Sequence, residues 1–240
     1  TELTISPDAP VEVRRVHLIN DQGRARVLRL TSYGEVVLGA QAGDMRHPAY
    51  SKMFVESGYM PELHLQVFSR RGHGNEDQPA VMGHMLVVRE HDDVTDPAAP
   101  VRHESDRMAF VGRGRTLRDP AALSSPDYLT GTTGMTLDPI YSLGTEIAIP
   151  AHGSRELAYL TLAAPDRPTL LSLARQYRQW EAIERTFHEA NTAALTWLGR
   201  RDMHTEDLRA ALAAASALLY SDPERRSKAA TLAANHLSQA

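Results

Sequence analysis

One irregular stretch of the sequence, residues 112–120, gathers more groups that could do chemistry than any other stretch. It reads Gly-Arg-Gly-Arg-Thr-Leu-Arg-Asp-Pro, so three arginines stand beside two glycines. The planar guanidinium fork of arginine suits a carboxylate or a phosphate, and loops on a rigid scaffold frequently carry function. We therefore predict a displayed contact loop with affinity for anions. Its candidate residues are Arg113, Gly114, Arg115, Thr116, Arg118 and Asp119.

The same arginines could instead brace the loop. Asp106, Asp119 and Asp127 lie near them in the sequence and could pair with them. For any single arginine this structural role competes with ligand contact, and the sequence leaves both open. A Walker-type phosphate loop is excluded, because GxxxxGK[ST] leading into a helix is absent.

Other kinds of site find little support. Cysteine is absent, which excludes a thiol nucleophile and a thiolate metal site. The 11 histidines include no HExxH pair and no GxSxG elbow occurs, so we predict no metal site and no cofactor. His64 and His84, which we expect on strands, could meet across a sheet. Four carboxylates could serve glycoside chemistry, although nothing fixes their separation: Glu56, Glu62, Asp119 and Asp138.

The sequence also gives little support for a surface on which sugars stack against aromatic rings. Aromatic residues make up only 6% of the chain. Trp180 and Trp197 fall in a helical tail, where we expect them to pack in a core. Five tyrosines in the β-rich part could still contact a sugar: Tyr33, Tyr50, Tyr59, Tyr128 and Tyr141.

The elements that must position these groups are mainly strands. Short apolar-alternating runs separated by turn signals continue to about Ala164 and favour an antiparallel β-sandwich or barrel. Residues 11–19 and 25–38 flank an Asn-Asp-Gln-Gly turn signal and predict a hairpin. We also expect strands at residues 52–56 and 106–111, and a loop at residues 41–51.

A helical tail follows the strands. Residues 169–200 have helical periodicity with a break near Gln179, and Asp166 or Thr169 could cap the first helix. Thr205 opens a second predicted helix, and residues 223–236 form a third. We predict a β-sandwich domain over residues 1–164 and a helical linker over residues 165–240.

Bulk composition narrows the class of protein. The chain has 240 residues, is 42% hydrophobic and 23% charged, and reads as an ordinary soluble globular protein. A net charge of −4 argues against a nucleic-acid partner. The sequence begins without Met and stops inside an apparent helix, so we expect a piece of a longer chain.

Three motifs together resemble a known family. They are FVGRGRTLRDPAAL with LDPIYSL within residues 110–143, LTSYGEVVL at residues 30–38 and HPAYSKMFVES at residues 47–57. The combination resembles the β-supersandwich domain of glycoside hydrolase family 94, and within that family the cyclic β-1,2-glucan synthetases. The resemblance extends over nearly the whole chain, from about Val11 onward.

The resemblance implies a galactose mutarotase-like supersandwich, linker helices and then an (α/α)6 barrel that carries the catalytic acid. This chain would end where the barrel begins, so no catalytic residue is assigned and the isolated chain is predicted to be inactive. The implied partners are the barrel of the parent chain, a β-glucan oligosaccharide and phosphate in the intact enzyme, and a second copy in a homodimer. The implied location is cytoplasmic, at the inner membrane if the parent is the membrane synthetase.

We therefore predict a non-catalytic sandwich segment of a glycosyltransferase or glycoside phosphorylase. It would pack on the barrel and cover a carbohydrate or phosphate site with residues 112–120. Two alternatives stay open: an independent carbohydrate-binding module, and a structural domain that only mediates dimerisation.

Overall fold

The computed structural model describes residues 1–39, 41–72, 81–90, 100–124, 128–220 and 227–234. The chain divides into two compact units, Thr1–Ala190 and Asn191–Ala240. The first unit holds all the described strands and the candidate loop, and the second is helical. The predicted class, an antiparallel β-supersandwich followed by helices, is confirmed.

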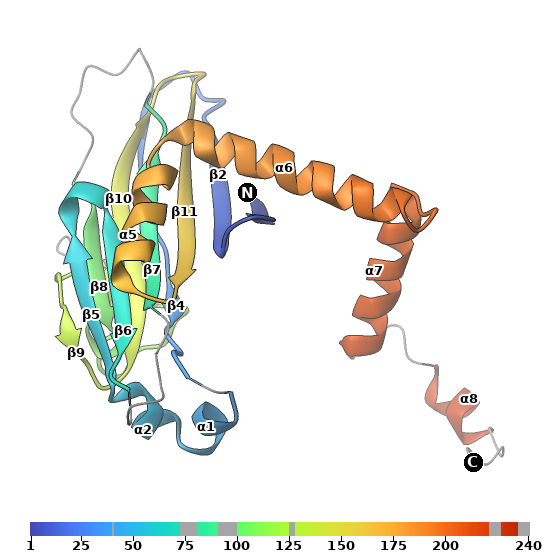
Figure 1. Cartoon of the computed structure of the whole chain (residues 1–240), viewed down its shortest axis with the longest axis horizontal. Coiled ribbons are helices and arrows are strands. Elements are labelled where there is room, and N and C mark those ends of the chain that lie inside the picture. Colours follow the sequence, from blue (N-terminus) through green and yellow to red (C-terminus); the bar gives the residue numbers. More distant parts are fainter. Residues whose placement is uncertain (40, 73–80, 91–99, 125–127, 221–226, 235–240) are drawn as a thin grey trace. The chain divides into compact units, whose positions relative to one another are not determined.

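The first unit contains a large antiparallel sheet (Figure 1). Its strands lie in the order β1-β2-β11-β7-β6-β5-β9. Their bounds are Glu2–Ile5 for β1, Val11–Ile19 for β2, Ser154–Ala164 for β11, Val81–Val88 for β7, Leu65–Arg70 for β6, Val55–Met60 for β5 and Gly134–Met135 for β9.

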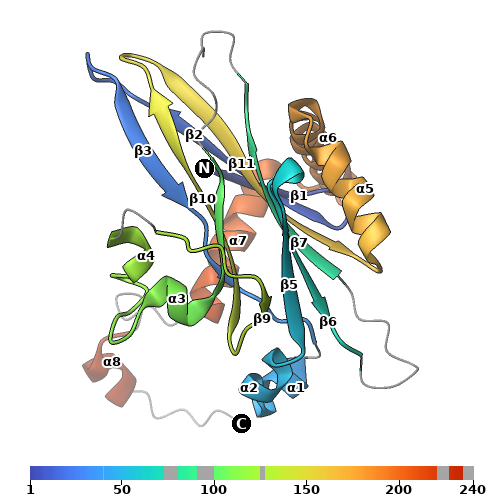
Figure 2. The same ribbon diagram turned by 90° about the vertical axis from the view of Figure 1, so that its left-hand side faces the viewer.

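A smaller sheet is built around one long strand, β10 (Pro139–Ile149). Strand β3 (Arg26–Thr31) and strand β4 (Gly34–Glu35) pair with different parts of β10. Strand β8 (Arg102–Asp106) also pairs with β10, with a register shift between Pro139 and Ser142. Figure 2 shows this sheet beside β11 and β2 of the larger sheet.

The central strands of the larger sheet are buried on both faces because their residues alternate between two cores. On one face Val13, Leu160 and Met85 pack against helix α5 (Arg167–Tyr177) through Leu170 and Ala174. On the other face Leu86, Leu157 and Tyr159 pack with Leu143 and Ile147 of β10. Successive strand residues point to opposite faces, so one short segment serves both cores.

The predicted hairpin across residues 20–23 is wrong. Strand β2 pairs with β1 and β11 in the larger sheet, whereas β3 pairs with β10 in the smaller one. The side-chain amide of Asn20 donates to the carbonyls of Arg24 and Pro150, each at 2.8 Å. The backbone N–H of Asn20 donates to Gly153, so the β2–β3 and β10–β11 connections lie together where both cross between sheets.

Several local predictions are also corrected. Residues 106–111 form helix α3 (Arg107–Val111) rather than a strand, because the Asp106 carboxylate accepts from the Met108 N–H and caps it. Helices α1 (Gln41–Arg46) and α2 (Pro48–Lys52) occupy most of the predicted loop at residues 41–51. The predicted strand at residues 52–56 starts at Val55. His64 lies in the left-handed region, at φ 47°, after the short helix η1 (Pro61–Leu63), so it is not on a strand.

The helical tail follows its predicted order. Helix α5 begins after the Asp166 cap, and α6 (Trp180–Gly199) follows the predicted break. Helix α7 (Thr205–Leu219) begins at Thr205 with His204 as its N-cap residue. Helix α8 (Ala229–Ala233) lies within the third predicted helix, whose residues 223–226, 235 and 236 are outside the described ranges.

The described residues contain neither a candidate membrane span nor a candidate metal cluster. None of their helices combines the length and the apolar character that a membrane span requires. In the same residues, no three His, Asp or Glu side chains gather in a way that could hold a metal ion.

Candidate functional site

The predicted contact loop, residues 112–120, is anchored at both ends. Helix α3 precedes the loop and ends with the buried Phe110 and Val111. Helix α4 (Ala121–Ser124) follows the loop and carries the buried Ala122. These residues form one apolar cluster with Tyr128, Leu129 and Ile140. Every residue between the anchors, from 113 to 119, is exposed. The loop is therefore an exposed segment on a fixed base.

Two glycines give the loop its path. Gly112 ends α3 at φ 84°, and its N–H donates to the Met108 carbonyl at 2.8 Å. A Cβ atom at this position would lie 2.7 Å from the Cβ of Ala121, so only glycine fits without a shift. Gly114 has φ 73° but open space around it. Both turns depend on a conformation that side-chain-bearing residues rarely adopt.

The three arginines of the loop differ in their partners. Arg115 donates to Ser124 at 2.9 Å and pairs with Asp119 at 3.4 Å, so it braces the loop. Within the described part of the chain, the guanidinium groups of Arg113 and Arg118 form no hydrogen bond or ion pair. Thr116 accepts from the backbone N–H of Arg118 at 3.3 Å, which shapes the turn.

Of the two roles left open by the sequence, the described residues show contacts for the bracing role. The bracing role belongs to Arg115, with Asp119 as its partner. Asp106 is occupied as the cap of α3, and Asp127 lies outside the described residues. Arg113 and Arg118 stand exposed with their five-donor forks available for an external carboxylate or phosphate.

An ionic cluster supports the base of the loop. Lys52 of α2 pairs with Asp138 at 2.7 Å and with Glu35 at 3.6 Å. Arg107 of α3 lies 3.7 Å from each of these carboxylates and donates to the Tyr33 hydroxyl at 3.3 Å. Burial lowers the pKa of Lys52, but the hydrogen bond and charge of Asp138 outweigh it and raise that pKa. Asp138, one of the four carboxylates considered for catalysis, therefore has a structural role.

The Gly/Thr segment after the loop is held by a buried carboxylate. Glu104 of β8 is 1% exposed and accepts from the backbone N–H groups of Ser105 and Asp106, each at 2.9 Å. It also accepts from the N–H and the hydroxyl of Thr130. Ser105 in turn donates to the Thr132 carbonyl at 2.7 Å. Glu104 therefore holds Thr130 through both its backbone and its hydroxyl group.

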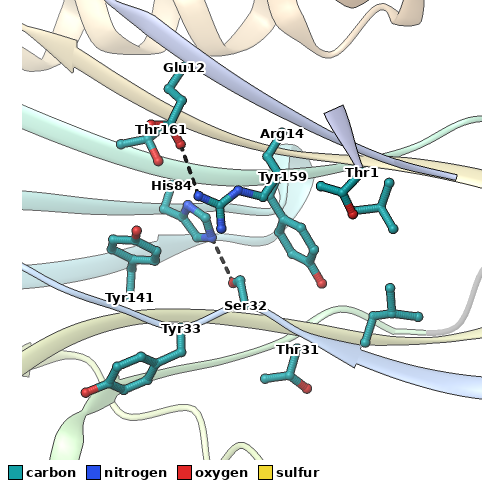
Figure 3. Close-up of a pocket in the computed structure, with 12 residues that line it drawn as sticks. Thr1, Glu12, Arg14, Thr31, Ser32, Tyr33, His84, Tyr141, Tyr159 and Thr161 are labelled. Atoms are coloured by element: carbon teal, nitrogen blue, oxygen red, sulfur yellow. Dashed lines mark hydrogen bonds and ion pairs between the residues drawn. The ribbon is translucent and has the colours of Figure 1, made fainter. Parts of the chain in front are cut away.

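A second feature lies between the two sheets: a cavity of about 370 Å³ with a mixed polar and apolar lining (Figure 3). The strand register explains its lining. Thr161 stands opposite both Glu12 and His84, and Tyr159 stands opposite Arg14 in the next row. These five side chains share one face of the larger sheet. Thr31, Ser32 and Tyr33 line the cavity from the end of β3, and Tyr141 lines it from β10.

His84 is the most enclosed polar group of the cavity, at 3% exposed. Its Nε2 atom lies 2.8 Å from the Ser32 hydroxyl, and its ring lies 4.2 Å from that of Tyr141. Burial, reinforced by the Arg14 charge, lowers the pKa of His84 to about 3, although the Leu160 backbone partly opposes this. His84 is therefore a neutral imidazole at neutral pH.

Three buried polar atoms of the cavity residues lack a hydrogen-bond partner among the described residues. They are Nδ1 of His84, the hydroxyl oxygen of Tyr159 and the hydroxyl oxygen of Thr31. The Leu160 backbone affects the His84 pKa without giving Nδ1 a hydrogen bond of good geometry. Burial also raises the pKa of Tyr159 well above its usual range. Unpaired buried groups are unusual in folded proteins and call for an explanation.

The sequence indicated the loop but missed the cavity. Of the tyrosines proposed for sugar contact, Tyr33 and Tyr141 line it, whereas Tyr50, Tyr59 and Tyr128 do not. The available signal was a run of polar residues at alternate positions, Glu12, Arg14, Tyr159 and Thr161, in strands that otherwise bury apolar residues. His64 and His84 do not form a shared metal site in the described part of the chain.

Comparison with known proteins gives two matches. Residues 1–180 match the family model described as glycosyl hydrolase 94, supersandwich domain. A protein named cyclic beta-(1,2)-glucan synthase NdvB, from Rhizobium meliloti (strain 1021), is 31% identical over 241 residues. That alignment covers 99% of this chain and 8% of the relative, so the chain spans a small part of the relative's length.

Proposed function

Because this chain belongs to the glycosyl hydrolase 94 supersandwich domain family, we propose that it is the non-catalytic sandwich segment of a cyclic β-1,2-glucan synthase or a related glycoside phosphorylase. The chain is 31% identical to the relative, and the alignment covers 99% of this chain but only 8% of the relative, which supports this proposal. The chain then corresponds to one segment of a much larger enzyme. Other segments, including an (α/α)6 barrel, would supply the groups that break and form glycosidic bonds.

The loop at residues 112–120 is the proposed contact with that barrel and its substrates. The observation that carries this proposal is the pair of exposed arginines, Arg113 and Arg118, on a loop whose ends are fixed in an apolar cluster. A fixed base limits the entropy lost when the loop meets a ligand. A guanidinium fork suits phosphate, and its donors also suit sugar hydroxyls.

The test uses the full-length parent enzyme with Arg113→Ala, Arg118→Ala and the double variant. We expect the KM for phosphate in release of glucose 1-phosphate from β-1,2-glucan to rise by about tenfold or more for each. Loss of one hydrogen bond to a charged group costs about 1.5–3 kcal/mol, which corresponds to that factor. Arg175→Ala, at an exposed position of α5, is the matched control and should leave the kinetics unchanged.

The alternative of a purely structural role gives a different outcome. If the sandwich only mediates dimerisation, the loop variants would change the oligomeric state, measured by light scattering, or change nothing at all. Unchanged kinetics in the double variant would refute the loop proposal. The isolated 240-residue chain should release no glucose 1-phosphate from glucan and phosphate, and release would refute the non-catalytic assignment.

A further inference from the structure

We propose that a methionine surface at one end of the sandwich packs against another segment of the parent enzyme. This inference rests on the function proposed above, and it names a contact outside the arginine-bearing loop. The surface is formed by exposed apolar side chains that follow α2, lie on α3 and lie in or just after β9. They are Met53, 49% exposed, Met108, 66% exposed, Met135, 52% exposed, and Leu137, 81% exposed.

Polar contacts bring most of this surface together. The Lys52 ammonium pairs with the Asp138 carboxylate at 2.7 Å, and the backbone N–H of Arg107 donates to the Asp138 carbonyl at 3.1 Å. The ends of α2, α3 and the segment before β10 therefore meet at one point. The residues next to these three in the sequence are Met53, Met108 and Leu137.

Strand β9 brings the remaining methionine to the same end. It is the edge strand of the larger sheet and pairs with β5. Met135 lies opposite Glu56, which is three residues after Met53. Figure 2 shows β9, α2 and α3 near one another at this end of the first unit. Single exposed apolar residues are normal on a protein surface, whereas several gathered together mark a contact site.

The charges at this surface are paired with one another. Lys52 contacts both Asp138 and Glu35, and Arg107 lies 3.7 Å from each of these carboxylates. The two cations and two anions balance, so the cluster exerts little long-range attraction on a nucleic acid or an anionic lipid headgroup. Methionine and arginine are enriched in protein–protein interfaces, and the flexible methionine side chain adapts to the surface it meets. The surface therefore suits a protein partner.

The position of the surface favours the parent chain as that partner. The alignment with the relative covers only 8% of its length, so an enzyme of that kind has many further segments that could cover it. Helix α3 leads from Met108 directly into the loop at residues 112–120, and Leu123 of α4, after the loop, is 55% exposed. A segment that contacts the loop would therefore lie beside Met108 and Leu123 as well.

The experiment compares methionine oxidation by hydrogen peroxide in the full-length parent enzyme and in the 240-residue chain. Mass spectrometry measures the sulfoxide formed at each methionine. In the 240-residue chain, Met53, Met108 and Met135 should oxidise much faster than Met85, which is 0% exposed. In the parent enzyme each of the three should oxidise about tenfold more slowly, because oxidation follows the exposure of the sulfur.

A charged substitution tests whether the protection comes from packing. Met108→Glu in the parent enzyme would place a carboxylate in the contact, and burial of an unpaired charge is costly. Met53 and Met135 should then oxidise as fast as they do in the 240-residue chain. Val27→Glu is the matched control, because Val27 is also 66% exposed but lies on β3, and it should leave the protection intact. Both variants should leave the Tm of the 240-residue chain unchanged, since surface substitutions cost little.

Two outcomes would overturn the proposal. One is equal oxidation of the three methionines in the parent enzyme and in the 240-residue chain. The other is slower oxidation in the 240-residue chain as its concentration rises, which would assign the surface to a second copy. Unchanged kinetics in the Arg113 and Arg118 variants, with the methionines protected, would refute the loop proposal and leave this contact standing.

Discussion

The buried histidine of the cavity makes the stability of the sandwich dependent on pH. His84 has its pKa lowered to about 3 by burial and by Arg14, from a usual value of 6.5. Glu12, Tyr33, Tyr141, Tyr159 and the Thr1 amino group are the other titratable groups that line the cavity. The substitution His84→Gln keeps a polar side chain that can bond to Ser32 but cannot take up a proton. The wild-type chain and this variant should therefore respond differently to acid.

The sign and the size follow from proton uptake. The folded-state pKa of His84 is depressed, so between pH 6.5 and about 3 the unfolded chain binds a proton that the folded chain does not. Stability from this group is complete above pH 6.5 and is lost as pH falls through that window. At about 1.36 kcal/mol per pH unit, His84 should cost the wild type about 2 kcal/mol between pH 8 and pH 5.

The assay is urea unfolding at pH 8, 6.5 and 5, followed by tryptophan fluorescence. Trp180 reports on the sandwich because it packs against the core that α5 forms with the larger sheet. His64 and His103 also have their pKa values lowered by burial, so the wild type loses stability in acid for more than one reason. The difference between the wild type and His84→Gln isolates the contribution of His84.

Two results would contradict this reasoning. Parallel pH dependence in the wild type and in His84→Gln would mean that His84 takes up its proton in the folded chain near its usual pKa. A variant with a steeper dependence than the wild type would reverse the predicted sign. His47→Gln, at an exposed position, is the control that separates the effect of burial from the mere removal of a histidine.

Two further pairs of substitutions test the cavity and the loop through stability. Tyr159→Phe should stabilise the chain by about 1 kcal/mol, because it removes a buried hydroxyl without a partner, whereas Tyr177→Phe should destabilise it by about 1 kcal/mol by leaving Thr186 without its 3.1 Å contact. Equal effects of the two in urea unfolding would contradict the assignment. Gly112→Ala should cost about 2–3 kcal/mol through its positive φ and its contact with α4, and Gly114→Ala, with open space around it, should cost less. The reverse order in thermal unfolding would show that the loop path does not depend on Gly112.

Local sequence patterns predicted most elements but failed where short segments have two possible structures. Residues 106–111 carry both an apolar run and the cap that makes them helical, and five residues are too few to show a helical period. Residues 41–51 contain Gly and Pro and were expected to be a loop, yet they fold into two helices of six and five residues. Longer helices such as α6 show their period clearly.

The sequence of a single strand does not show which distant strand it pairs with. The turn predicted at Asn20 is present, but it connects strands of two different sheets. The backbone N–H of Asn20 donates to the carbonyl of Gly153, which lies in the neighbouring β10–β11 connection. The cavity arises in the same way. Glu12, His84 and Thr161 come from three strands, and only the register places them in one row.

The sequence by itself determined the fold class, the helical tail and the family, because each depends on short motifs or on periodicity within one segment. The tertiary structure alone decided which arginine of the loop has side-chain partners among the described residues. It also decided that His84, Tyr159 and Thr31 share one cavity with unpaired polar atoms. Burial and partner choice depend on contacts between residues far apart in the chain, and no local pattern encodes them.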